Sequence, residues 1–388
     1  MKPTRLLCCL LICFCSIALF SGEAMSKPKK KKAKPSVQKP AKPPVLKPAG
    51  PPIQAKGKVA WTMVVLPDTQ NYVQYPENRE IFNQITQWIK DNKEKRNIAL
   101  VLHEGDIVNN STPEQWTAAQ AAMKTLDGVV PYILTLGNHD YQVAGDAQRR
   151  TPVNQYFPIT ANPLVDPKCG GIAKGFYKDG ELQNAYYEFT APDGRGFLIC
   201  SLEFGPREKV VEWANEIAAK KEYADHTAIL LTHAYLKGNA KRDNHVPYKH
   251  IAAKKKMPRG NPHTHLLKAD TNDGEELWTK LVAPNPNFQL TFSGHFTDKP
   301  GAYLRSPRSG MSPVYQLFFN RQTDPNGGDG WIRLLEFMDD GKTVQVKTYS
   351  PKFDQYETDA VNQFFFPLSP APPKVKDTAE NTAEKKAA

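Results

Sequence analysis

The stretch Val59-Ala60-Trp61-Thr62-Met63-Val64-Val65-Leu66-Pro67-Asp68-Thr69-Gln70 joins an apolar run to a polar one. Its first eight residues are rich in β-branched and aromatic side chains, which predicts a buried strand over residues 59–66. An acid and an amide, Asp68 and Gln70, stand where that strand ends. The stretch therefore raises the question of why a buried strand should deliver these two side chains to a loop.

The segments that follow alternate between helix and strand patterns. Apolar residues at helical spacing predict a helix over 77–93, and strands are predicted at 97–102 and 130–136. Between these strands, Thr112 is a candidate N-cap, Pro113 suits the first helical position, and Gln115 could reach back to the cap. This helix is predicted to run to Leu126. The resulting βαβαβ series predicts parallel strands with helices on the faces of the sheet.

Later segments add antiparallel strands to this pattern. A hairpin is predicted around the turn at residues 193–196, and a second closes across residues 339–341. The further predicted strands are 186–190, 197–202, 227–232, 288–292, 331–337 and 343–349, and the further predicted helices are 206–220 and 275–282. We therefore expect one α/β domain over residues 59–368, built from two packed mixed β-sheets flanked by helices.

The net charge of +11 is confined to one end of the chain. Residues 1–58 carry a net charge of +12, with Glu23 as their only acid, so the remaining chain sums to −1. A neutral domain with a basic tail gives no reason to expect specific nucleic-acid binding. With 388 residues and 40% hydrophobic content, the chain is long and apolar enough to bury a sizeable core.

Residues 1–24 have the pattern of a signal peptide. Two basic residues precede an apolar run from Leu6 to Phe20, and small residues lead to a cleavage point after Ala24. An uncleaved anchor is one alternative, but this run is shorter than the roughly 20 residues that span a bilayer. A lipid-modified cysteine is another. We predict an exported protein, which would be periplasmic, attached to the cell envelope or secreted.

Residues 25–58 are dominated by Lys, Pro and Ala and contain no acid. Such a segment cannot form a core, so we expect a disordered, extended linker. Its eleven lysines could hold it to anionic envelope polymers or a membrane surface, or it could be a solvated linker without a specific partner. The polar stretch 369–388 is predicted to be a disordered C-terminal tail.

Polar residues stand directly after five of the predicted strands. The five sets are Asp68 with Gln70, Gly105-Asp106-Ile107-Val108-Asn109, Gly137-Asn138-His139-Asp140, Thr232-His233 and Gly294-His295. Ligands of open α/β sheets bind beyond the carboxyl ends of the strands, so we expect these segments to meet at one edge. Taken singly, the Asp and Asn residues could be turn formers and the histidines core residues. Their common position favours a site for divalent first-row metals.

These motifs, in the order PDTQ, GDIVN, GNHD, H and GH, resemble those of the calcineurin-like metallophosphoesterases. The resemblance covers about residues 59–349. PDTQNY, together with the glycine-rich run at residues 325–331, is similar to a bacterial branch that carries Gln in place of the first motif's His. The resemblance implies the αββα sandwich of that superfamily and a metal-dependent phosphoric ester hydrolase.

The resemblance also implies a role for each motif residue. Asp68, Gln70 and Asp106 would bind a first ion, with Asp106 bridging, and Asn138, His233 and His295 would complete a second. His139 would give a proton to the leaving oxygen or clamp the phosphate, with Asp140 fixing its orientation. Metal-bound hydroxide would then attack the phosphorus of a phosphomonoester or phosphodiester.

Two residues depart from the family pattern around the first ion. Gln70 replaces a His, and Thr297 stands where a second His is expected, which leaves oxygen ligands with the Thr297 hydroxyl or Asp298 as further candidates. Oxygen ligands favour Mg²⁺, Ca²⁺ or Mn²⁺ over Zn²⁺ or Fe²⁺. We expect one or two divalent ions, with the first site the weaker. The alternative is an envelope-binding protein that keeps one metal site and has lost turnover.

Several other residues leave two interpretations open. His103 could orient the site or simply pack in the core. The insert at residues 236–273 could roof the site above an anionic substrate, or its histidines could be ordinary surface residues. Arg321 could contact phosphate, and Cys169 could pair with Cys200 in an oxidising compartment. The four histidines of the insert are His245, His250, His263 and His265.

Overall fold

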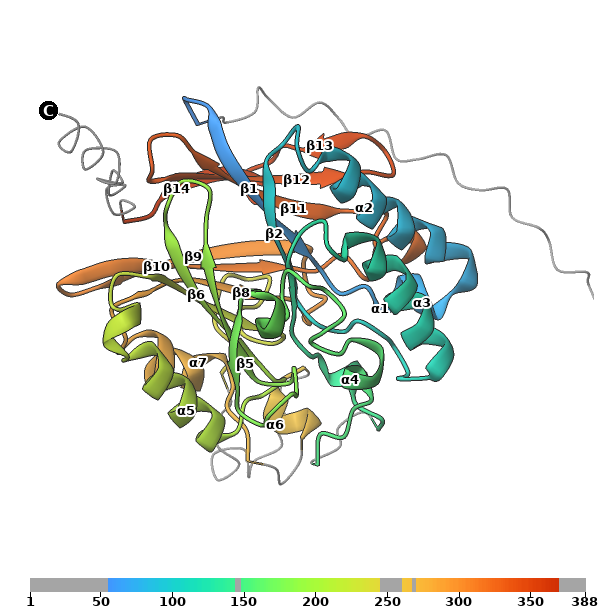
Figure 1. The fold of residues 1–388 in the computed structure, drawn as a ribbon, viewed down its shortest axis with the longest axis horizontal. Coiled ribbons are helices and arrows are strands. Elements are labelled where there is room, and N and C mark those ends of the chain that lie inside the picture. Colours follow the sequence, from blue (N-terminus) through green and yellow to red (C-terminus); the bar gives the residue numbers. More distant parts are fainter. Residues whose placement is uncertain (1–54, 144–147, 245–259, 267–269, 370–388) are drawn as a thin grey trace, which may run out of the picture. The chain divides into compact units, whose positions relative to one another are not determined.

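The computed structural model describes residues 55–143, 148–244, 260–266 and 270–369, all of which belong to one compact unit at residues 48–388. Two seven-stranded sheets pack face to face, with helices on their outer faces (Figure 1). The predicted α/β architecture of two mixed sheets flanked by helices is therefore confirmed. The predicted signal peptide, nearly all of the predicted linker and residues 370–388 lie outside the described residues.

The first sheet has the strand order β13-β12-β11-β1-β2-β3, and β14 pairs with β12. Strands β1, β2 and β3 run parallel, as predicted, whereas β11 is antiparallel to β1. The bounds are β1 Val59–Leu66, β2 Ile98–His103, β3 Tyr132–Leu134, β11 Ile332–Met338, β12 Thr343–Ser350, β13 Gln355–Glu357 and β14 Gln363–Pro367.

The second sheet has the order β4-β5-β6-β7-β8-β10-β9. Strands β6, β7, β8 and β10 run parallel, and the predicted hairpin of β5 and β6 is present. The hairpin of β9 and β10 was not predicted. The bounds are β4 Ala173–Phe176, β5 Ala185–Thr190, β6 Gly196–Leu202, β7 Thr227–Thr232, β8 Phe288–Ser293, β9 Gly301–Arg308 and β10 Met311–Phe319.

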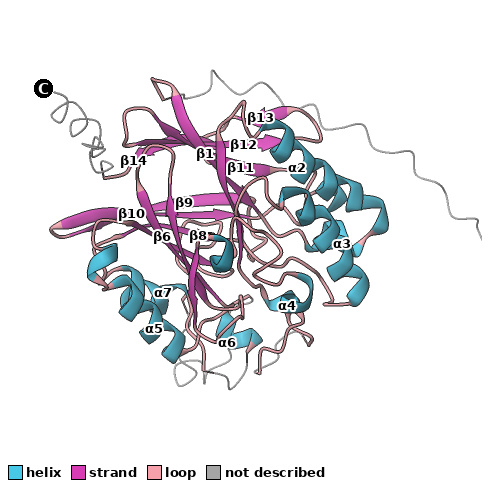
Figure 2. Ribbon diagram, in the orientation of Figure 1, coloured by secondary structure: helices cyan, strands magenta, loops and turns pink. Residues whose placement is uncertain are grey.

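The helices lie on opposite sides of the two sheets (Figure 2). Helices α1 (Gln70–Gln74), α2 (Arg79–Asn92) and α3 (Pro113–Met123) cover the first sheet, and α5 (Glu208–Ala218) and α7 (Gly274–Leu277) cover the second. A π-helical turn at Trp278–Val282 extends α7. The remaining short helices are α4 (Val153–Tyr156) and α6 (Pro262–His265), and 3₁₀ turns occur at Pro76–Asn78, Lys124–Leu126, Asn138–Asp140, Pro167–Cys169, Lys221–Tyr223 and Pro325–Gly327.

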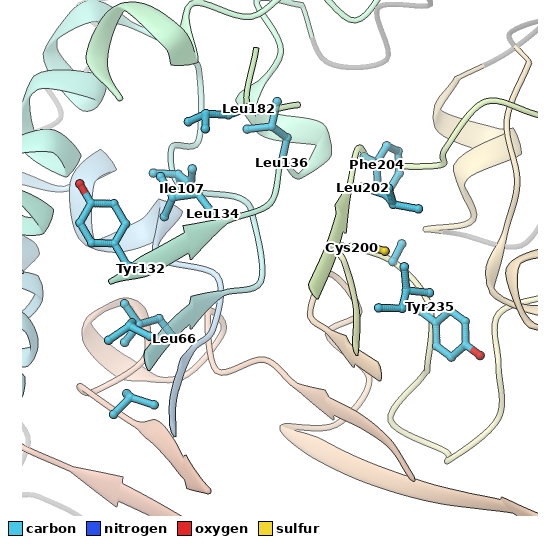
Figure 3. Packing of buried hydrophobic residues seen from close by; sticks show 14 of the residues in the cluster. Leu66, Ile107, Tyr132, Leu134, Leu136, Leu182, Cys200, Leu202, Phe204 and Tyr235 are labelled. Carbon is cyan, nitrogen blue, oxygen red and sulfur yellow. The ribbon is translucent and has the colours of Figure 1, made fainter. Parts of the chain in front are cut away.

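Strand β1 is buried on both faces, which explains its continuous apolar sequence. Trp61, Met63 and Val65 belong to the cluster between the two sheets, where the Trp61 ring stacks on Phe337 at 3.9 Å. Leu66 faces the other way, in a cluster that also contains Leu134 and Leu202 (Figure 3). With both faces packed, the carboxyl end of β1 is a rigid support for the residues that follow it.

Cys169 and Cys200 do not form a disulfide. Cys169 is exposed, Cys200 is buried in the core, and both thiols are free. Within the described residues, no helix combines the length and the apolar character needed to cross a membrane.

We expect Trp61→Ala to lower the free energy of unfolding by about 3–5 kcal/mol, because it removes a fully buried indole from between the sheets. Urea unfolding measures the change, followed by far-ultraviolet circular dichroism because that signal comes mainly from the backbone rather than from tryptophan. The matched control is Phe365→Ala, whose side chain is 50% exposed and whose removal should change stability by less than about 0.5 kcal/mol. Equal effects of the two substitutions would contradict the central role of β1.

Candidate metal centre

The carboxyl ends of strands from both sheets carry the predicted site residues to one place. Asp106 follows β2, His233 follows β7 and His295 follows β8, and one ligand atom from each lies within 4.8 Å of the other two. All three side chains are buried. The structure therefore brings together residues that are up to 189 positions apart in the sequence.

The hydrogen bonds of the two histidines leave two nitrogen lone pairs facing each other. His233 Nδ1 donates to the Glu104 carbonyl at 2.7 Å, and His295 Nε2 donates to the Gly260 carbonyl at 2.6 Å. Metal binding requires neutral imidazoles, which carry one hydrogen each, and in that form His233 Nε2 and His295 Nδ1, 3.2 Å apart, are both acceptors. Asp106 Oδ2 lies 3.1 Å from His233 Nε2. Three acceptors at this separation fit a shared cation.

Asn138, in the loop after β3, carries a further candidate ligand atom. Its Oδ1 is buried and accepts no hydrogen bond from any residue that the structure describes. A buried carbonyl oxygen without a partner is destabilising by about 1–3 kcal/mol, so a ligand is expected there. Two nitrogens and two oxygens are a suitable set for Mn²⁺, Fe²⁺ or Zn²⁺. The residues predicted for the second ion therefore fit a metal.

Two of these residues have a strained backbone. Asp106 has φ 48° and His295 has φ 72°, in the left-handed region that residues with a side chain rarely adopt. Such conformations are each unfavourable by about 1–3 kcal/mol and persist only where the surrounding structure holds them. Backbone strain at two candidate ligands supports the assignment of this place as a functional site.

Burial and neighbouring charges shift the pKa values of several groups in the site. Burial raises the pKa of Asp68 to about 8, although His233 offsets part of the effect, and burial raises the pKa of Glu104 well above its usual value. Burial lowers the pKa of His233, but the charges of Asp106 and Asp68 outweigh it and raise that pKa to about 9. A bound divalent cation would displace the proton that this raised pKa keeps on His233.

The first metal position is surrounded by amides rather than imidazoles. Asp68 Oδ2 accepts hydrogen bonds from Asn320 Nδ2 at 2.8 Å and from Gln322 Nε2 at 2.9 Å. Gln70 Nε2 donates to Gln322 Oε1, and Gln70 Oε1 is buried without a hydrogen-bond partner in the described chain. Asn320 and Gln322 were not predicted from the sequence as site residues.

Thr297 and Asp298, the further candidate ligands, are both exposed. Asp298 accepts a hydrogen bond from the Gly238 amide at 3.2 Å. Both residues border a cavity of about 440 Å³ that reaches His295 and is also lined by Lys237, Asn239, Gly260 and Phe296. Their place is therefore on the solvent side of the centre, at a cavity that leads to it.

His139 and Asp140 lie beside the centre with different partners from those implied. His139 Nδ1 donates to the Asn109 carbonyl at 2.7 Å, and the His139 amide donates to Asp106 Oδ1 at 3.0 Å. The Asp140 carboxylate accepts from the amides of Val108 at 3.0 Å and Gly137 at 2.8 Å, and burial raises its pKa well above the usual value. The resemblance implied that Asp140 orients the His139 ring, and this expectation was wrong. Asp140 instead connects the second and third motif loops, and the Asn109 carbonyl orients His139.

His103 was expected either to orient the site or simply to pack in the core, and its hydrogen bonds support the orienting role. Its Nδ1 accepts from the Gly105 amide at 3.1 Å, so its Nε2 donates to Thr69 Oγ1 at 2.9 Å, and Thr69 donates to the Ile107 carbonyl at 3.2 Å. Burial lowers the pKa of His103 to about 3, which keeps the ring neutral. This chain of bonds connects the loops after β1 and β2.

Gln115 also serves the site rather than the helix cap. Thr112 caps α3 as predicted, with its Oγ1 accepting from the Gln115 amide at 3.4 Å. The Gln115 side chain does not reach back to the cap as expected; its Oε1 accepts from the amides of Asn109 at 2.9 Å and Asn110 at 2.8 Å. Helix α3 thereby fixes the end of the GDIVN loop, which carries the carbonyl that holds His139.

The insert and Arg321 give mixed outcomes. Arg321 binds Glu357 through both terminal nitrogens, at 2.8 and 3.0 Å, so the suggested phosphate contact is replaced by an ion pair. His263 pairs with Glu276 at 2.7 Å. His265 is half-buried, with its ring centroid 5.4 Å from that of His295, so one histidine of the insert does border the centre. His245 and His250 lie outside the described residues.

Two motif glycines are required by close approach. A Cβ on Gly137 would overlap the Asp106 carboxylate, and a Cβ on Gly294 would overlap Asp68 Oδ1. Any larger residue at either place would push a candidate ligand away from the centre. The glycines of GNHD and GH are thus part of the site, although they bind nothing themselves.

Comparisons with known proteins agree with this arrangement. The family model "Calcineurin-like phosphoesterase" matches residues 62–297. An uncharacterized protein of Bacillus subtilis (strain 168), YvnB, is 30% identical over 329 residues, which are 80% of this chain but 22% of that protein. The chain thus spans under a quarter of the length of this relative.

Solved structures give weaker likenesses. Purple acid phosphatase PPD1 from yellow lupin (Lupinus luteus) has a TM-score of 0.45 at 12% identity, covering 80% of this chain and 54% of that one. The NAD nucleotidase NadN of Haemophilus influenzae has a TM-score of 0.39 at 14% identity, covering 79% of this chain and 50% of that one.

We expect Gly294→Ala to weaken divalent-metal binding by roughly tenfold or more, because the new methyl group displaces the Asp68 carboxylate. Metal content after dialysis, measured by plasma mass spectrometry, checks this. The control is Gly310→Ala, at a turn where nothing lies within 4 Å of the added methyl group, so only the left-handed backbone opposes it, by about 1 kcal/mol. Unchanged metal content in Gly294→Ala would count against the site as described.

Proposed function

Because the chain belongs to the calcineurin-like phosphoesterase family, we propose that it hydrolyses a phosphomonoester or phosphodiester with the help of one or two divalent ions. The family is one of metal-dependent phosphoester hydrolases. The observation that carries the proposal is the set of facing acceptors on Asp106, His233 and His295, which fits a cation. The proposal covers both of these ester classes.

Each residue of the second position has a defined part in this proposal. Asp106, Asn138, His233 and His295 would hold one divalent ion, which when bound would neutralise phosphoryl charge and lower the pKa of an attacking water. Glu104 and Gly260 keep the two imidazoles in the tautomers that binding needs, through their carbonyls. The protein thus enters the reaction with its ligand atoms already oriented.

His139 is the residue best placed to act on the substrate itself. Asn109 fixes its ring through Nδ1, which leaves Nε2 for a substrate oxygen, and the side chain is only half-buried. Nε2 would hold a proton for the leaving oxygen or bond to a phosphoryl oxygen. The backbone bond from His139 to Asp106 couples the position of this ring to that of a candidate metal ligand.

The cavity beside His295 is the proposed entrance for the ester. Lys237 at its wall offers a positive charge, although it also pairs with Asp243 at 2.6 Å, and Phe296 offers an aromatic surface. This combination suits a phosphate carrying an organic leaving group more than a bare phosphate ion. The half-buried His265 stands nearby and would meet the substrate from the insert.

We also propose that the protein is exported, with its lysine-rich linker in contact with anionic envelope polymers or a membrane surface. The support is the signal-like pattern of residues 1–24 and the +12 charge of residues 1–58. If so, the mature chain begins at Met25, which N-terminal sequencing of the secreted or periplasmic protein checks. A chain that keeps residues 1–24 and stays in the cytoplasm overturns this part.

A second candidate function is an envelope-binding protein that keeps one metal and has no turnover. The specific observation in its favour is the amide set around Asp68, in which Gln70 and Gln322 stand where a metal site would use stronger ligands. The assay below separates the two functions.

We expect His139→Ala to reduce the turnover of a chromogenic phosphate ester by roughly 10²–10⁴-fold while leaving the metal content unchanged. The assay is run with Mn²⁺, Mg²⁺ and Zn²⁺, for a monoester and a diester, and with a chelator to confirm metal dependence. The control is His226→Ala, at a distant histidine that lies 3.4 Å from Glu188 and should have wild-type turnover.

The outcomes of this assay are decisive in both directions. Metal-dependent hydrolysis that His139→Ala lowers and His226→Ala does not would support the proposed function. Bound metal without hydrolysis of either ester under any condition would overturn it and leave the envelope-binding protein as the better interpretation.

A further inference from the structure

Two amide side chains reach the first metal position from a strand end outside the predicted motifs. Asn320 and Gln322 follow β10, which runs parallel to β8, so its carboxyl end lies at the same edge as that of β8. Both side chains are buried, with 3% and 9% of their surface exposed. Both donate to Asp68 Oδ2.

The orientation of the Asn320 amide is fixed by the backbone. Asn320 Oδ1 accepts from the backbone N–H of Gln322 at 2.9 Å, and a backbone N–H can only donate. The opposite end of the amide, Nδ2, is therefore the end that faces Asp68. Asn320 thus holds the Asp68 carboxylate in place through its side-chain nitrogen, and the side-chain oxygen cannot take that position.

The orientation of the Gln322 amide follows in the same way. Its Nε2 faces the His295 carbonyl at 3.5 Å, which can only accept, and Asp68 Oδ2 at 2.9 Å, which accepts in the carboxylate form that metal binding requires. Its Oε1 must then be the end that meets Gln70, and Gln70 must donate to it through Nε2. The chain of donors and acceptors from Asp68 to Gln70 has one consistent direction.

With the hydrogen bonds in this direction, the side-chain oxygen of Gln70 is the last atom of the hydrogen-bonded series. Gln70 Oε1 is buried, and no described residue donates to it. An amide nitrogen cannot bind a cation, whereas an amide oxygen can, so the direction of this series decides whether Gln70 is able to be a ligand. Without Gln322, the side-chain amide of Gln70 would be free to rotate by half a turn, because its χ3 torsion has a broad, nearly two-fold energy profile.

We propose that Asn320 and Gln322 are positioning residues that hold Asp68 and Gln70 so that the Gln70 oxygen binds a first ion. The first position is then an oxygen-only site for Mg²⁺, Ca²⁺ or Mn²⁺, next to the imidazole-containing second position, which takes Mn²⁺, Fe²⁺ or Zn²⁺. This inference rests on the proposed function for the purpose of the ion, but its test does not use hydrolysis.

The experiment titrates Mn²⁺ into the metal-free full chain, with calorimetry for affinity and electron paramagnetic resonance for the free ion. The variants are Gln322→Met, Gln70→Met and the double variant, since Met has about the length of Gln and lacks the amide. Gln289→Met is the matched control, at a glutamine that is 7% exposed and accepts from the Ser369 amide at 2.9 Å, away from the centre. Thermal melting of each variant checks the fold.

We expect the wild-type chain and the control to bind one Mn²⁺ tightly and a second one weakly. Gln322→Met should weaken binding of the weak ion, at the first position, by roughly 10- to 100-fold and leave the tight ion at the second position unchanged. Because Gln322 acts in part through Gln70, the losses of the two single variants should be less than additive in the double variant. Zn²⁺ should fill the tight position and leave the weak one open to Mg²⁺.

Three results would overturn the inference: wild-type affinity for the weak ion in Gln322→Met, additive losses in the double variant, or a single divalent ion in the wild-type chain. If Gln322→Met melts early, Gln322→Asn gives the same test, because it keeps an amide but is one methylene too short for both contacts. Two bound ions with the expected losses but no hydrolysis would contradict the proposed function alone.

Discussion

Two backbone carbonyls, those of Glu104 and Gly260, determine the chemistry at the centre of this protein. By accepting the only hydrogen on each neutral imidazole, they turn the lone pairs of His233 and His295 toward each other and toward Asp106. Acceptors held this close repel one another unless a cation lies between them. The fold supplies the rigidity for this arrangement, because each group stands at the end of a strand or beside one, and the double-sided packing of β1 and its neighbours prevents relaxation.

The loops between the strands are held by hydrogen bonds from side chains to the backbone of neighbouring loops. His103 connects the loops after β1 and β2, Asp140 connects those after β2 and β3, and Gln115 holds the loop that positions His139. Each of these side chains bonds to backbone amides, so it fixes the path of the chain rather than one side chain. The left-handed backbone at Asp106 is stable in this setting because its neighbours on both sides are held.

The sequence was sufficient for most of the fold and for the residues of the second position. Continuous apolar runs marked β2, β7 and β8, and polar residues that follow them are the ones that the structure brings together. It was insufficient for Asn320 and Gln322, because the β9–β10 hairpin was not identified. Had Met311–Phe319 been predicted as a strand, the same rule about strand ends would have pointed to Asn320. The partner of His139 was also beyond the sequence, since a backbone carbonyl leaves no residue signature.

The place of β1 in its sheet has a consequence for how the chain reaches this structure. On one side β1 pairs with β2, which follows closely in the sequence, but on the other it pairs with β11, about 270 residues later. During synthesis from the N-terminus, one edge of an apolar strand therefore stays open until almost the whole domain has emerged. Such an edge invites pairing with other chains, and this would favour a delay in folding until the polypeptide is complete.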